Sequence, residues 1–211
     1  MALLLAIALF FSGAVFSTAA LGKGVYQTAP EFITDVFSPE EPRQEYLWLT
    51  PELKTSAGVI MKHSVRGLRV RYWRLGVKTA WVMEEIGKEL PITVGVVINQ
   101  GRVELVKILA FRESRGWEVR YPAFTAQYLG AQMTPDKKMD THVDGITGAT
   151  LSVRAVTKVA TLALFYHQQV TAAQDKSLQS KLLQNKLSQN KLSQNKLSQN
   201  KETSPLVTET P

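Results

Sequence analysis

DGITGAT, residues 144–150, separates a strand-rich region from a strongly amphipathic helix. Asp144 and Gly145 are typical of a turn, because glycine accepts positive φ. Gly148 allows the backbone to approach a bulky group closely. Thr150 stands where the helix should begin, and a helix N-terminus offers unpaired N–H groups and a dipole that favour phosphate. The Thr150 hydroxyl is therefore placed either to cap this helix or to become esterified to a phosphate.

The same seven residues resemble the flavinylation motif of the FMN-binding domain family. This domain occurs in the C subunit of the sodium-pumping NADH:quinone reductase and in the G subunit of the Rnf complex. In that family the last threonine of a Ser/Thr-Gly-Ala-Thr sequence carries FMN through a phosphoester bond. A separate Mg-dependent FAD:protein FMN transferase attaches it. The resemblance extends over the strand-rich region from about Arg71 to Arg120 and the helix after Thr150.

The resemblance implies covalent FMN at Thr150 and supporting roles for the residues before it. Asp144 would fix the turn with Gly145 and help the transferase to recognise the site. The phosphate pocket would be shaped by backbone N–H groups of Thr147, Gly148 and Ala149. The alternative is that Gly-Ala-Thr before a helix is only a loop and a cap.

The composition excludes several kinds of site. The chain has 211 residues, no cysteine and a net charge of +7. Without cysteine there are no disulfides, Cys-ligated zinc sites, iron–sulfur clusters or c-type haem attachment. The histidines, His63, His142 and His167, lack metal-ligand spacing, so we expect no metal site. Glu84 and Glu85 should face opposite ways on a strand, and no catalytic residues stand out.

Residues 1–21 are predicted to be a signal peptide or an N-terminal membrane anchor. Residues 2–22 carry no charge and are rich in Leu, Ala and Phe. Such a run suits a secretory signal, and it is also just long enough to span a bilayer. Both interpretations place the folded part in the periplasm or at the extracytoplasmic face of the membrane. Neither favours a nucleic-acid partner.

Residues 22–66 are expected to form an N-terminal extension with one short helix. Residues 29–42 look extended, because they are acidic and contain several prolines. Thr50-Pro51-Glu52 starts a helix that runs to about Lys62.

Residues 67–170 are predicted to be the FMN-binding domain. Apolar alternation or continuity predicts strands at 67–75, 78–86, 92–98, 103–111 and 117–121. A short helix or turn follows at 122–132, and the amphipathic helix runs from Thr150 to about Gln169 with Arg154 and Lys158 outward. The fold class is α+β, a mainly antiparallel sheet with helices packed on one face.

Residues 171–211 are expected to be a disordered tail. From Lys181 the pentad Lys-Leu-x-Gln-Asn repeats. A period of five matches neither a helix nor a strand, so its leucines cannot gather on one face. A tail without aromatic residues and with few apolar ones cannot build a core.

Other side chains are candidates for the flavin environment. Tyr72, Trp73 or Tyr121 could stack on the flavin ring, and His142 could line the site. A cluster of arginines could balance flavin charge or dock a redox partner: Arg66, Arg69, Arg71 and Arg74. Each of these also has an ordinary interpretation as sheet packing or a solvated face.

The sequence thus predicts an exported electron-transfer flavoprotein, a carrier more than a stand-alone enzyme. Its partners would be the FAD:protein FMN transferase and membrane or periplasmic redox proteins. Two alternatives stay open: an anchored subunit of a membrane oxidoreductase complex, and a non-redox extracytoplasmic binding module.

Overall fold

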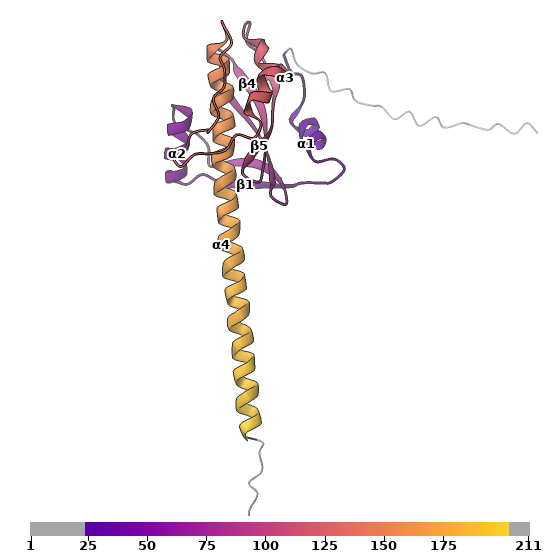
Figure 1. Cartoon of the computed structure of the whole chain (residues 1–211), viewed down its shortest axis with the longest axis vertical. Helices are drawn as coiled ribbons and strands as arrows, with labels where there is room; N and C mark the ends of the chain where they lie inside the picture. Colours follow the sequence, from indigo (N-terminus) through magenta and orange to yellow (C-terminus); the bar gives the residue numbers. More distant parts are fainter. Residues whose placement is uncertain (1–23, 203–211) are drawn as a thin grey trace, which may run out of the picture.

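A five-stranded antiparallel sheet forms the body of the protein (Figure 1). The computed structural model describes residues 24–202, so the predicted signal peptide or anchor at 1–21 lies outside the described residues. The strands follow one another in the sheet in chain order: β1 (Arg43–Trp48), β2 (Arg69–Leu75), β3 (Lys78–Ile86), β4 (Pro91–Asn99) and β5 (Arg102–Phe111). The predicted α+β class is confirmed, and the four strands expected between residues 67 and 111 are present.

One face of the sheet packs against α4 (Thr150–Glu202), and α2 (Pro51–Met61) packs against α4. The helix α2 begins as expected, with the Thr50 hydroxyl accepting the Leu53 N–H. The predicted apolar stripe of α4 is buried, and Val156 and Ala160 have no exposed surface. Trp81 of β3 is fully buried in the same core.

The opposite face is covered by α1 (Ala29–Phe37), which the sequence analysis expected to be extended. A reciprocal capping box between Thr28 and Glu31 starts this helix, and it outweighs the prolines and acids around it. Phe32 is fully buried against the sheet, over Gly95 of β4. A Cβ at Gly95 would stand 2.6 Å from the Phe32 ring, so this glycine makes room for α1.

Between β5 and α4 the chain forms short helical turns instead of a sixth strand. Residues 117–121 alternate in sequence, but the structure has the 3₁₀ helix η1 (Trp117–Arg120) there. The residue before it, Gly116, has a left-handed φ of 86°, which turns the chain out of the sheet after β5. The helix α3 (Pro122–Thr125) and the 3₁₀ helix η2 (Ala126–Tyr128) follow, and they confirm the predicted short helix or turn.

The predicted disordered tail is wrong for residues 171–202, because α4 continues through them as one helix (Figure 1). No glycine or proline interrupts Thr150–Glu202, and Lys, Leu and Gln are good helix formers. The side chains of residues 172–191 are all exposed, so this part of the helix adds nothing to the core. Within residues 24–202, no helix combines the length and apolar character that crossing a membrane requires.

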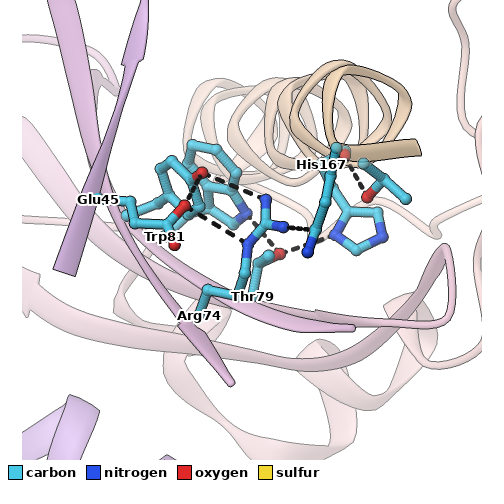
Figure 2. Close-up of polar contacts among 8 residues, drawn as sticks. Glu45, Arg74, Thr79, Trp81 and His167 are labelled. Carbon is cyan, nitrogen blue, oxygen red and sulfur yellow. Dashed lines mark hydrogen bonds and ion pairs between the residues drawn. The ribbon is translucent and has the colours of Figure 1, made fainter. Parts of the chain in front are cut away.

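A buried polar network fastens α4 to the sheet (Figure 2). His167 Nδ1 lies 2.8 Å from Thr79 Oγ1, which also accepts a 3.0 Å hydrogen bond from Trp81 Nε1. Arg74 forms an ion pair with Glu45 and donates to Gln174 of α4. Burial, aided by the charge of Arg74, lowers the pKa of His167 to about 4. The ring is therefore neutral near pH 7.

Candidate functional site

Thr150 is the first residue of α4, as the sequence predicted. A tight turn precedes it, in which the Ala149 N–H donates to Ile146 O at 2.9 Å. Gly148 occupies this turn with a φ of 81°, a conformation that other residues rarely adopt. The Thr150 side chain is exposed, and its hydroxyl makes no hydrogen bond to any residue that the structure describes. The first N–H groups of α4 therefore face outward around an accessible hydroxyl.

The loop before the turn is tied to the body of the protein. The Asp144 N–H donates to Gln127 Oε1 at 2.8 Å, and the side chains of Val143 and Ile146 pack on the core. The Asp144 carboxylate itself is 84% exposed, with His142 Nε2 at 3.7 Å. The loop is thus fixed through its backbone, while the Asp144 carboxylate faces solvent.

A polar cleft of about 620 Å³ opens at the N-terminus of α4. Its lining comes from the loop between β3 and β4, the loop after β5, and the start of α4: Lys88, Glu113, Ser114, Arg115, Gly148, Ala149, Thr150, Leu151 and Ser152. Two cations, Lys88 and Arg115, thus share a cleft with the positive end of the helix dipole. Such an arrangement suits a phosphate group.

Glu113 holds the two loops of the polar cleft together. Its Oε1 accepts the backbone N–H groups of Lys88, Glu89 and Leu90 at 2.6, 2.6 and 2.9 Å. Burial acts to raise the pKa of Glu113, but these three donors outweigh it, so the pKa lies below its ordinary value. The backbone thereby engages the carboxylate charge, and the loop that carries Lys88 is fixed to the loop after β5.

An apolar cleft of about 730 Å³ meets the polar cleft at Leu151, which lines both. Ile86, Val143 and Leu151 contribute its apolar surface. Four basic side chains also line the apolar cleft: Lys62, His142, Arg154 and Lys158. Both volumes lie within the ordinary range of small-molecule sites, so the joined clefts can accept a cofactor that has an anionic end and a flat apolar end.

The structure brings only some of the predicted flavin neighbours to Thr150. His142 lines the apolar cleft, and the motif residues Gly148 and Ala149 line the polar one. Tyr72 is stacked on Trp81 with ring centroids 4.7 Å apart, inside the core. Tyr121 pairs edge-on with Trp117 at 5.3 Å, and neither it nor Trp73 lines either cleft in the described part of the chain.

The arginine cluster also lies away from the two clefts. Arg69 stacks over Tyr46 at 4.1 Å, and Arg71 stacks over Trp73 at 5.1 Å. None of Arg66, Arg69, Arg71 and Arg74 lines either cleft in the described structure. Arg69 and Arg71 thus belong to a cationic and aromatic sheet face, whereas Arg74 pairs with Glu45 and contacts α4.

Three residues of the clefts were not singled out from the sequence: Lys88, Arg115 and Glu113. The only available signal was that both loops leave the same end of the sheet, one before β4 and one after β5. Lys158 was expected to point outward, but its ammonium group lies 2.9 Å from the buried carboxylate of Glu85. As predicted, Glu84 and Glu85 face opposite ways, since Glu84 is exposed and Glu85 is buried.

Among residues 24–202, no group of three or more His, Asp and Glu side chains is placed to hold a metal ion.

No curated protein matches the chain. The model of the FMN-binding domain family matches residues 87–164, which include β4, β5, both loops of the polar cleft and the first turns of α4. Residues 87–164 are therefore similar in sequence to the FMN-binding domain family.

Proposed function

We propose that the protein is an exported electron-transfer flavoprotein with FMN bound covalently to Thr150. The observation that carries the proposal is the exposed Thr150 hydroxyl, which lies in a cleft with Lys88 and Arg115 at a helix N-terminus. The FMN-binding domain match supports the choice of cofactor. Of the hydroxyl residues that line this cleft, Thr150 is the one at the end of the DGITGAT motif.

The polar cleft would hold the phosphate end of FMN. Lys88 and Arg115 supply opposite charge, and the outward N–H groups at the start of α4 supply hydrogen bonds. The turn formed by Thr147, Gly148 and Ala149 leaves the Thr150 hydroxyl accessible. A Cβ at Gly148 would meet no atom within 4 Å, so the positive φ is what requires glycine there.

Attachment would need a transferase and an FAD molecule. Thr150 Oγ1 would bond to the phosphorus of the FMN half of FAD, the pyrophosphate bond would break, and AMP would leave. The hydroxyl proton would pass to a base of the transferase. The exposed carboxylate of Asp144, beside the turn at Gly145, is available for recognition by that enzyme.

The apolar cleft would take the flat ring. Ile86, Val143 and Leu151 would exclude water from it, and the basic groups at the rim would face its polar edge. A bound flavin accepts and releases electrons, and the protein sets its position and electrostatic surroundings. A covalent link would keep the cofactor from diffusing away outside the cytoplasm.

The partners would be membrane or periplasmic redox proteins. The uncharged run at residues 2–22 supports export, either with cleavage or with the run retained as an anchor. Fractionation distinguishes the two, since a cleaved chain is released with soluble periplasmic proteins. A chain retained in the membrane fraction favours the anchored subunit of an oxidoreductase complex.

The test is peptide mapping by mass spectrometry after co-expression with an FAD:protein FMN transferase in a periplasm. We expect FMN on the peptide that contains Thr150, no FMN in Thr150→Ala, and unchanged attachment in Lys176→Gln, an exposed lysine far from the motif. Unmodified wild-type peptide, from cells that modify a control flavoprotein, would contradict the proposal and favour a non-redox binding module.

A further inference from the structure

The buried carboxylate of Glu85 joins three elements at the wall of the apolar cleft. Its side chain is 7% exposed; Oε1 lies 2.9 Å from Lys158 Nζ, and Oε2 lies 2.9 Å from His63 Nε2. Glu85 belongs to β3, Lys158 to α4, and His63 follows α2. Attachment of a cofactor at Thr150 makes no use of this group of residues.

The ion pair fixes one lysine in the cleft wall. A buried carboxylate is unstable without partners, so Glu85 holds Lys158 in place instead of leaving its long side chain free in solvent. The Lys158 side chain is only 28% exposed. A charge in such a partly buried position acts more strongly on its neighbours than an exposed charge does.

Lys158 lies beside the space that a ring attached through Thr150 would occupy. It follows Thr150 by eight residues, about 12 Å along the helix axis. It lines the apolar cleft together with Leu151, which borders the polar cleft. The other cations of this cleft, Lys62 and Arg154, are exposed, so water screens them more.

We propose that Lys158, positioned by Glu85 and His63, raises the reduction potential of the flavin by stabilising its reduced form. This inference rests on the proposed function. Two electrons from a redox protein and one proton from solvent enter the flavin, which leaves one added negative charge on it. The fixed ammonium group of Lys158 attracts that charge, whereas Glu85 opposes it.

The ion pair of Lys158 and Glu85 predicts shifts of opposite sign in the reduction potential of two variants. Lys158→Gln removes the cation, and we expect the reduction equilibrium to change about tenfold toward the oxidised form, about 30 mV for a two-electron couple. Glu85→Gln keeps an acceptor for Lys158 but removes the opposing charge, so its potential should be higher than that of wild type. Lys158→Arg should restore the wild-type potential.

The experiment is an equilibrium redox titration of the covalently loaded protein against reference dyes. Lys176→Gln, an exposed lysine farther along α4, is the remote control, and Arg154→Gln is the control within the cleft. Thermal unfolding is followed in parallel, because a purely structural role would lower stability without opposite shifts in potential.

The outcomes separate this inference from the proposed function. Equal potentials in wild type and Lys158→Gln, both carrying covalent flavin, would overturn the inference alone. An equal shift in Lys176→Gln or Arg154→Gln would also overturn it, since the effect would then not belong to the fixed cation. A wild-type protein that takes up no flavin would overturn the proposed function and this inference together.

Discussion

Gly116 lies so close to α4 that a Cβ added to it would stand 2.7 Å from Ser152 Oγ. This contact sets the loop after β5 against the first turn of the helix that begins at Thr150. The φ of Gly116 is 86°, so both the backbone conformation and the close approach require glycine.

Gly116→Ala should therefore lower both stability and FMN attachment. The strained φ alone costs about 1 kcal/mol, and the contact with Ser152 adds to it. Gly130→Ala is the matched control, because Gly130 has a φ of 79° with nothing within 4 Å. Chemical unfolding measures the stability of both variants. If the two lose equal stability and flavin, the contact between Gly116 and Ser152 has no role.

Lys88→Gln and Arg115→Gln should slow the attachment of FMN. Each variant removes one cation from the polar cleft, and a charged hydrogen bond of about 1.5–3 kcal/mol corresponds to roughly a tenfold or greater loss in affinity. Purified protein, transferase and FAD allow the rate to be followed by the growth of bound flavin. Lys176→Gln should match wild type. Wild-type rates in both cleft variants would contradict the role of the polar cleft.

His167 should make the protein less stable in mild acid. Its pKa is about 4 in the folded protein and 6.5 in the unfolded chain, so its effect is absent above about pH 6.5. As the pH falls from 6.5 toward 4, the unfolded chain binds a proton first, and the free energy of unfolding should drop by up to about 3 kcal/mol.

Other groups titrate in different windows. The hydrogen bond to Glu85, with that to the Ser64 carbonyl, raises the pKa of His63, so its stabilisation is present below 6.5 and is lost as the pH rises through the raised value. The carboxyl groups of Glu31 and Asp140 have lowered pKa values, so their stabilisation is lost only below their ordinary pKa. His167→Asn keeps an acceptor for Thr79 and should remove most of the slope between pH 4.5 and 6.5. An unchanged slope would show that another group causes it.

Removal of residues 177–211 should leave the melting temperature nearly unchanged. The side chains of residues 172–191 are exposed. The truncated chain also keeps Gln174, whose side chain accepts a hydrogen bond from Arg74. Circular dichroism should show less helix per molecule, in proportion to the deleted part of α4. A fall in melting temperature of more than a few degrees would mean that this extension packs on the body of the protein.

The sheet and the start of α4 followed from local sequence patterns. The continuous apolar run at residues 92–98 is β4, and every residue from Val94 to Ile98 is buried. Thr50-Pro51 marked the start of α2 because the signal for a helix start is short and local. The helix α1 carried an equally local signal, the capping box of Thr28 and Glu31, but the acidic and proline-rich surroundings obscured it.

The clefts could not be predicted in the same way. Lys88 and Arg115 are 27 positions apart, and they line one cleft because β4 and β5 pair and bring both loops to the N-terminus of α4. The partners of Glu85 are likewise distant in sequence, so no spacing linked it to Lys158. For residues 172–191, the absence of a core was correctly inferred, but helix formation depends on the backbone propensity of Lys, Leu and Gln and not on burial.

The most direct test of the account is whether flavin stays on the denatured protein through Thr150. Wild type, Thr150→Ala and Thr150→Ser would each be co-expressed with the transferase, denatured, separated on a gel and viewed under ultraviolet light. We predict a fluorescent wild-type band and a dark Thr150→Ala band, with fluorescence retained in Thr150→Ser because its hydroxyl remains. A dark wild-type band from cells that label a control flavoprotein, or a fluorescent Thr150→Ala band, would contradict covalent FMN at this residue.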